Sequence, residues 1–223
     1  FSGLAYDLIQ ALGKELDLKI EWTEETGWGS FNTGLDTGRY DVICTPVWQS
    51  GQRAKIVLLS EPLYFNALVA LKRKSDKKPY ATLDRINTPD VTVSVIDGDI
   101  TQAVLKAEFP NAKPLAAPAM SDGSQNLLDV ATKKADIAFS TWDGMERYNK
   151  NNPENLLMVA ANGAPVRLFG NSLAFQRKDY DMKLMFDAAL RTIYTSGKAQ
   201  KIIKKYEPGF YPAATPYALP NQE

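Results

Sequence analysis

The chain has 223 residues, and its 26 basic and 26 acidic side chains give a formal net charge of zero. It contains one cysteine and no histidine. Without histidine, a chain cannot form a Ser-His or Cys-His catalytic pair or a His-ligated zinc site. A balanced charge gives no general attraction to nucleic acid or anionic lipid. We therefore expect a small ligand held by local groups, with no metal, no cofactor and no nucleic-acid partner.

The single cysteine, Cys44, lies in the apolar run Val42-Ile43-Cys44. One thiol cannot form an internal disulfide or a thiolate metal cluster, so we expect an inert core residue. The length allows one large domain or two small ones. No apolar run approaches the roughly 20 residues that cross a bilayer, so we expect a water-soluble chain.

The first elements along the chain alternate between helix and strand. Apolar residues recur at intervals of three and four from Leu4 to Leu16, which predicts a one-sided helix. A strand is expected at residues 19–23. Ser30 is expected to cap a short helix that Gly38 ends, and residues 40–44 are expected to form a buried strand.

The same alternation continues to the end of the chain. We expect strands at residues 67–71, 91–96, 136–140 and 171–176, and helices at residues 101–109, 126–132, 179–196 and 199–206. The tail from Pro208 carries four prolines and is expected to run over the surface. Strands that alternate with helices predict an α/β fold with a mainly parallel sheet.

Two segments of the sequence resemble each other, residues 40–45 with Trp48 and residues 135–141 with Trp142. Each places an aspartate before a buried strand, and hydroxyl groups and an indole after it. In open α/β sheets, ligands bind beyond the carboxyl ends of strands. We expect two such ends to face one another across a cleft. The alternative is that short buried strands look alike and that tryptophans pack in cores.

The order of elements indicates that the chain leaves one lobe near residue 70 and returns to it near residue 170. Lobe 1 would comprise residues 1–70 and 171–223, and lobe 2 residues 71–170, with hinges near residues 69–73 and 168–172. A double connection restricts motion to closing or twisting, which suits a clamp around a small molecule. The charge cluster from Lys72 to Lys78 is interpreted as a solvated turn, with a basic docking patch as the alternative.

At this point the sequence resembles the type II periplasmic solute-binding proteins, in the branch that serves amino-acid ABC importers. The resemblance covers nearly the whole chain and depends on the order and spacing of several segments. These are Gly3-Leu4-Ala5-Tyr6-Asp7-Leu8, Gly38-Arg39-Tyr40-Asp41-Val42, Gln52-Arg53-Ala54-Lys55, Leu59-Ser60-Glu61-Pro62-Leu63-Tyr64, Phe109-Pro110-Asn111-Ala112, Ala135-Asp136-Ile137-Ala138 and residues 197–206. Family members usually carry a further strand before the first helix.

The resemblance implies two α/β lobes joined by two crossover strands, with ligand trapped between them. It implies a monomer in the periplasm, or lipid-anchored outside the cytoplasm, that delivers its solute to the membrane permease of an ABC importer. It also implies that the protein is not an enzyme. The alternatives are a ligand-sensing domain of a membrane receptor and a dehydratase that acts on cyclic carboxylates. A dehydratase needs a general acid with a raised pKa, and the residue at the second-lobe strand end is Thr141.

In the resemblance, Arg53 occupies the position of the arginine that clamps the ligand carboxylate. A planar guanidinium suits this role because it forms two parallel charge-assisted hydrogen bonds. The alternative is a surface arginine at a turn. Thr45 and Ser50 lie in the same predicted loop and are expected to present hydroxyls or amides. Trp28 matches an aromatic that stacks on the ligand, with a core indole as its alternative.

In the second lobe, the segment from Gly98 to Thr101 matches the turn that opens the first helix. The amides and the positive dipole end of that helix favour a carboxylate, and Thr101 is the residue that we expect to contact it. Asp97 and Asp99 flank this turn. They are expected to cap the helix or, as the alternative, to bind a cation.

Two departures from the family bear on the ligand. Members that bind α-amino acids place Ser or Thr five positions before the arginine, where this chain has Trp48. They place an acid for the ammonium group at the second-lobe strand end, where this chain has Thr141. Trp48 and Trp142 are candidates to hold an amine by cation-π attraction, and Asp97, Asp99 and Asp143 are candidates to replace the acid. A carboxylate ligand without an amine remains the alternative.

Overall fold

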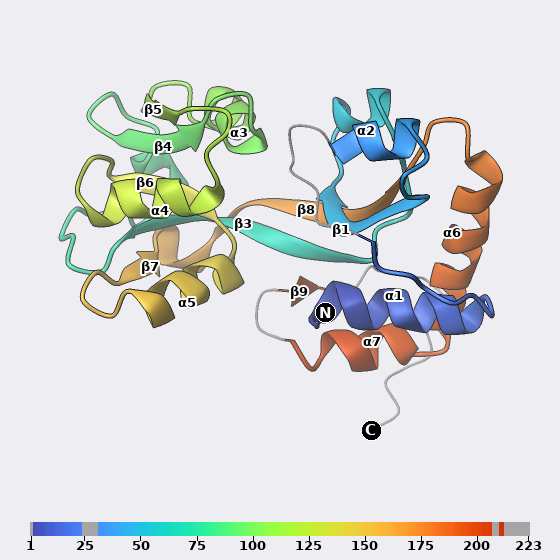
Figure 1. Ribbon diagram of the computed structural model, residues 1–223. Helices are drawn as coiled ribbons and strands as arrows, with labels where there is room; N and C mark the ends of the chain where they lie inside the picture. The colour runs from blue at the N-terminus through green and yellow to red at the C-terminus, as the bar shows by residue number, and fades with distance from the viewer. Residues whose placement is uncertain (1, 24–30, 207–209, 212–223) are drawn as a thin grey trace. The chain divides into compact units, whose positions relative to one another are not determined.

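The computed structural model describes residues 2–23, 31–206 and 210–211 (Figure 1). The chain forms two compact units, one of residues 1–66 and 169–223 and the other of residues 67–168. The first boundary falls within strand β3 (Tyr64–Arg73) and the second within strand β8 (Pro165–Phe175). The hinge function expected of these two connections stays a prediction.

Unit 1 is built from both ends of the chain. It contains the N-terminal end of β3 and the C-terminal end of β8, together with α1 (Leu4–Glu15), α2 (Phe31–Asp36), β1 (Val42–Trp48), the 3₁₀ turn η1 (Arg53–Lys55), β2 (Leu58–Leu59), α6 (Tyr180–Thr195), α7 (Lys198–Ile203) and β9 (Phe210–Tyr211). Strand β8 pairs antiparallel with β1 and β2, and β9 pairs antiparallel with β3. The helices α1, α6 and α7 confirm the predicted first helix and the two predicted C-terminal helices.

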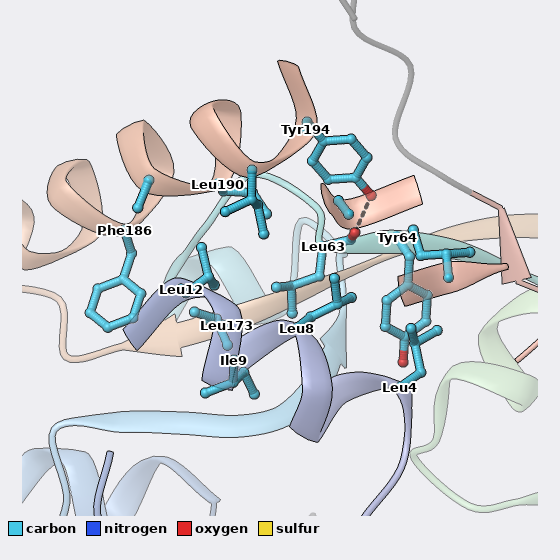
Figure 2. Close-up of a cluster of buried hydrophobic side chains, with 14 of the residues drawn as sticks. Leu4, Leu8, Ile9, Leu12, Leu63, Tyr64, Leu173, Phe186, Leu190 and Tyr194 are labelled. Atoms are coloured by element: carbon cyan, nitrogen blue, oxygen red, sulfur yellow. Dashed lines mark hydrogen bonds between the residues drawn. The ribbon is translucent and has the colours of Figure 1, made fainter. Parts of the chain in front are cut away.

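The core of unit 1 lies between α1 and α6 (Figure 2). The predicted helical periodicity is confirmed, because α1 buries a row of apolar residues, Leu4, Leu8, Ile9 and Leu12. They pack in one cluster with Phe186 and Leu190 of α6. The Tyr194 hydroxyl in this cluster donates a hydrogen bond to the Leu63 carbonyl, so the ring is buried without an unsatisfied polar group. Each fully buried aliphatic side chain contributes roughly 1.5–3 kcal/mol to stability.

A buried carboxylate ties α6 to the segment that precedes β3. Asp187 accepts a hydrogen bond from the Glu61 backbone N–H at 2.8 Å and pairs with Lys183 one turn earlier. Arg191 pairs with the Glu61 side chain. Because buried charges are tolerated only when they are paired, this arrangement fixes the segment around Glu61 against the helix.

Unit 2 is a sheet flanked by helices. It contains η2 (Leu83–Arg85), β4 (Thr92–Ile96), α3 (Ile100–Glu108), β5 (Lys113–Ala117), α4 (Gly123–Ala131), β6 (Ile137–Ser140), α5 (Trp142–Asn151), β7 (Leu157–Val159) and η3 (Ala161–Gly163). The predicted strands at 91–96 and 136–140 and the helix at 101–109 are confirmed within one residue. Helix α4 begins three residues earlier than predicted because Asp122 caps it, accepting a hydrogen bond from the Ser124 N–H at 2.7 Å.

The sheet follows the strand order β1-β8-β3-β6-β4-β5 and is mixed in direction. The prediction of a mainly parallel sheet is wrong. Among the pairings described, β4 pairs parallel with β5 and β6, whereas β3 pairs antiparallel with β6 and β7, and β8 with β1 and β2. Parallel pairing requires a crossover helix, which α3 and α4 supply, and the long strands β3 and β8 pair with their neighbours without one.

The strand expected at residues 19–23 is also not found. The segment from residue 18 to residue 23 has no regular secondary structure, although Ile20 and Trp22 pack against the core of unit 1. The alternating pattern therefore reflects one-sided burial without a strand partner among the described residues. Ser30, the expected helix cap, and most of the tail after Pro208 lie outside those residues. Within them, no helix has both the length and the apolar character needed to cross a membrane.

Candidate functional site

Three of the predicted site residues meet in the turn after β1. Strand β1 ends at Trp48, and the half-buried Arg53 begins η1. The Arg53 side chain donates a hydrogen bond through Nη1 to the Trp48 carbonyl at 3.0 Å. The Arg53 backbone N–H donates to the Ser50 hydroxyl at 3.2 Å. The guanidinium is thus attached to the backbone of its own turn.

The turn that carries Arg53 is fastened to β8 through Gln49. The Gln49 backbone N–H donates to the Gly170 carbonyl at 2.9 Å, and its side-chain amide donates to the Ser60 carbonyl at 3.0 Å. A Cβ atom at Gly170 would lie 2.7 Å from the Gln49 side-chain oxygen and 3.1 Å from the Pro62 Cβ, so a larger residue would displace the Gln49 side chain. The Ser60 hydroxyl in turn accepts a hydrogen bond from the Leu173 N–H at 2.9 Å. The position of Arg53 is therefore set by contacts on both sides of the turn.

Trp48 has a partner that the sequence did not indicate. Its indole stacks on the buried Phe169 ring, with centroids 4.6 Å apart and planes inclined by 4°. One face of the indole is covered by this contact, so a ligand would reach Trp48 at the opposite face or at an edge. Phe169 is 121 residues away in sequence, and no local pattern links the two rings.

Thr45 differs from the prediction, because it lies inside β1 rather than in the loop with Ser50. The pairing of β1 with β8 is irregular between Ile43 and Val47, and Pro46 has no N–H to donate to the ladder. The strand therefore continues past the interruption to Trp48, and Thr45 is exposed on it. Trp28 lies outside the described residues.

The turn before α3 in unit 2 is closed by its own side chains. Gly98 adopts a positive φ of 74°, and its N–H donates to the Gln102 side chain at 3.2 Å. Asp99 caps α3, and its carboxylate accepts hydrogen bonds from the Thr101 N–H and hydroxyl, both at 2.9 Å. The capping role expected of Asp99 is confirmed, whereas Asp97 accepts a hydrogen bond from Gln102. A ligand carboxylate at this helix end would compete with Asp99.

Thr141 and Trp142 open helix α5. Thr141 is the N-cap, and its hydroxyl accepts a hydrogen bond from the Gly144 N–H at 3.3 Å. Trp142 is the first residue of the helix and packs against a core cluster of unit 2. Asp143, a candidate partner for an amine, lies 3.3 Å from Arg147 in an ion pair. The strand end in unit 2 thus carries a hydroxyl that is used locally and a carboxylate that is already paired.

Cys44 is a free thiol at an intermediate level of burial. Burial raises the pKa of this thiol to about 11, which keeps it protonated and unreactive at neutral pH. Across residues 2–23, 31–206 and 210–211, no three aspartate, glutamate or cysteine side chains are grouped so that they could hold a metal ion. These two observations therefore add neither a reactive thiol nor a metal site to the groups around Arg53 in the described residues.

The family model for bacterial extracellular solute-binding proteins, family 3, matches residues 1–209. The chain belongs to this family. Among curated proteins, this solute-binding protein is 23% identical over 209 residues to the ABC transporter arginine-binding protein 1 of Escherichia coli K12. That alignment covers 92% of the present chain and 82% of the relative.

Solved structures confirm the two-lobed periplasmic-binding-protein fold. The periplasmic VFT2 domain of BvgS from Bordetella pertussis is similar with a TM-score of 0.79 and 21% identity, over 93% of this chain and 84% of that one. The ancestral amino-acid-binding protein AncCDT-1, a precursor of cyclohexadienyl dehydratase, has a TM-score of 0.73 and 23% identity. Its alignment covers 92% of this chain and 84% of that one.

The predicted binding residues of this solute-binding protein fall into two groups. Trp48, Ser50 and Arg53 share one turn of unit 1, and Gly98, Thr101, Thr141 and Trp142 lie at helix starts of unit 2. Sequence reasoning missed the supports of the first group, Gln49, Phe169 and Gly170. The glycine is the one support with a detectable signal, because an isolated glycine within a strand pattern suggests the close approach of another backbone or ligand.

Proposed function

We propose that this solute-binding protein binds a small carboxylate-bearing solute through Arg53 and delivers it to the permease of an ABC importer. The observation that carries the proposal is the attachment of the Arg53 guanidinium to the Trp48 carbonyl, within a turn that Gln49 fastens to β8. A cation held in this way is oriented before the ligand arrives. Preorganisation lowers the entropy cost of binding, and a guanidinium matches a carboxylate in plane and charge.

The family relationship supports an extracytoplasmic role. The relative from Escherichia coli is an arginine-binding component of an ABC transporter, which favours an amino acid or a related molecule as the solute of the present chain. Contacts that form only when both lobes grip the solute would stabilise a closed form. The permease would then recognise that form.

The proposed solute class includes acids that lack an amine. The hydroxyl of Thr141 caps α5, and the Asp143 carboxylate already forms an ion pair with Arg147. An ammonium group of the solute would have to compete with Arg147 for that carboxylate. An amine, where the solute has one, would be held by Asp97 or Asp99 or by the indole of Trp48. Cation-π contact contributes about 0.5–2 kcal/mol, less than a well-formed ion pair in a dry site.

We also propose that no bond is made or broken in the site. General acid catalysis needs a group whose pKa lies near the operating pH, so that it can release its proton to the reacting atom. Thr141 at the strand end is an alcohol, which is too weak an acid for this role, and its oxygen caps α5. This supports binding without turnover.

A solute panel tests the proposal. The intact protein would be titrated by calorimetry with basic, polar and acidic L-amino acids, with di- and monocarboxylic acids, and with the methyl ester of every acid that binds. We expect saturable binding of at least one acid, with a rise in melting temperature that grows with solute concentration. The ester should bind at least 10-fold more weakly, because it cannot form two charge-assisted bonds with a guanidinium. Failure of the whole panel, or equal affinity for acid and ester, would contradict the proposal.

A further inference from the structure

A groove in unit 2 shares Trp142 with the predicted solute-binding residues but is otherwise lined by residues outside that set. It is open to solvent and has a volume of about 930 Å³, and its walls are the basic turn after β3, the segment that contains β7 and η3, and one side of α5. All of its lining residues fall between Lys72 and Gly163, so the groove belongs to unit 2, whereas Arg53 belongs to unit 1. Its volume lies in the range of small-molecule sites, roughly 300–1,000 Å³.

Asp76, which lines the groove, and Asp136, which pairs with the lining residue Lys78, both form ion pairs. Asp76 forms an ion pair with Arg73 at 2.9 Å, and Asp136 forms one with Lys78 at 2.8 Å. Arg73 also lies 3.8 Å from Asp136. These four charges therefore cancel among themselves and contribute little net field at the groove.

Three further lysines at the groove are not paired with a carboxylate in the described residues. Within the described part of the chain, Lys72, Lys74 and Lys77 have no carboxylate partner, and all three line the groove. The Lys72 ammonium is held by the carbonyls of Asp76 and Lys78, at 3.0 and 3.4 Å, and lies 5.9 Å from the centre of the Tyr80 ring. Neutral groups thus fix its position without compensating its charge.

The remaining lining of the groove is largely apolar. Tyr80 is 6% exposed and Leu157 is 2% exposed, and Met145 is buried beside them. Trp142 and Val159 are half-buried in the same wall. Burial raises the pKa of the Tyr80 hydroxyl to about 12, so this ring stays neutral and does not cancel the charge of the lysines. A basic rim thus adjoins an apolar wall.

We propose that this groove binds a small soluble anion with an apolar body, such as a phosphate or carboxylate on a short aliphatic or aromatic chain. The anionic group pairs with Lys72, Lys74 and Lys77, and the body packs against Trp142 and Val159. Charge complementarity selects the anion, and burial of the body at roughly 25 cal/mol per Å² selects the amphiphile over a bare ion. The three lysines and Val159 are not among the residues expected to bind the solute at Arg53, and Trp142 is the residue that the two predicted sites share.

Hexyl phosphate, titrated by calorimetry into the intact protein, tests this inference. We expect saturable binding that weakens as salt is added, with inorganic phosphate and hexanol each binding at least 10-fold more weakly. The triple variant Lys72→Gln, Lys74→Gln, Lys77→Gln should lose at least 10-fold in affinity. The pair Lys74→Gln, Lys77→Gln changes only exposed side chains and should show a smaller loss in the same direction.

The matched control is Lys201→Gln, Lys204→Gln, Lys205→Gln, which removes the same charge from exposed positions of unit 1 and should leave binding unchanged. Arg53→Ala should also leave it unchanged, and a loss there would place the anion at the solute site and overturn the proposal. Equal affinity of both lysine triples would overturn it as well. Vesicles of phosphatidylglycerol and of phosphatidylcholine form a second arm. Binding to the anionic vesicles without binding of hexyl phosphate would identify a membrane surface as the occupant and contradict a soluble ligand.

Discussion

Two aspartates that look equivalent in the sequence have different surroundings in the structure. Asp41 and Asp136 each precede a strand, but Asp41 is exposed. Asp136 accepts hydrogen bonds from Lys78 at 2.8 Å and from the Thr92 N–H at 3.0 Å. Burial raises the pKa of Asp136, whereas the two hydrogen bonds and the positive charges of Lys78 and Arg73 lower it. The lowering effects are together the larger, so the net pKa falls below its ordinary value of 3.8. Partners 58 and 44 positions away cannot be predicted from the local motif.

Asp136 is therefore expected to contribute to acid denaturation. A carboxylate with a lowered pKa in the folded state stabilises the protein above pH 3.8, and that stability is lost as the pH falls through its folded pKa. Asp136→Asn should flatten the dependence of unfolding free energy on pH below about pH 4, by up to ~1.4 kcal/mol per pH unit. Urea denaturation between pH 3 and pH 6 measures this slope. The control Asp84→Asn changes an exposed carboxylate of unit 2 and should keep the wild-type slope; the same slope in all three proteins would contradict the account.

At the scale of elements, caps and periodicity predicted the helices well. Helices α1, α3 and α6 lie where apolar spacing placed them, because each buries one stripe against its own unit. The direction of strand pairing and the absence of a strand at residues 19–23 were not predictable. Both depend on partners that are distant in sequence. Phe169 and Gly170, which support the turn of Arg53, were missed for the same reason.

Helix α2 offers a test of packing between neighbouring elements. A Cβ atom at Gly34 would lie 2.1 Å from the ring of the buried Tyr40, so α2 can pack against that ring only with glycine at this position. Gly34→Ala should destabilise the protein by about 1–3 kcal/mol, as overpacked cores do. The double change with Tyr40→Leu should recover part of this loss. Urea denaturation measures both.

Gly123→Ala provides the matched control, because that glycine begins α4 and a Cβ there meets no atom within 4 Å. The change should be neutral or slightly stabilising, in keeping with the higher helix propensity of alanine. Equal stability of the Gly34→Ala and Gly123→Ala proteins would contradict the claim that the contact with Tyr40 requires glycine at position 34.

At the scale of the whole molecule, the family and the two-lobed fold followed from the order of motifs along the chain. The structure places the unit boundaries at residues 66/67 and 168/169, inside β3 and β8. These two strands are the connections expected to act as hinges, and that role stays a prediction. The solute itself was not predictable, because Trp48 and Thr141 are expected to stand where related proteins carry the side chains that recognise amino-acid ligands.

The central claim is that Arg53 holds the carboxylate of the solute. Calorimetric titration of the best-binding solute into the wild type, Arg53→Ala and Arg177→Ala tests it most directly. Arg177 is a suitable control because its guanidinium also binds a backbone carbonyl at η1, that of Lys55, yet it has no proposed contact with solute. Truncating a buried charge partner costs about 2–5 kcal/mol, so Arg53→Ala should bind roughly 30-fold or more weakly with an unchanged circular dichroism spectrum. Wild-type affinity in Arg53→Ala would contradict the claim.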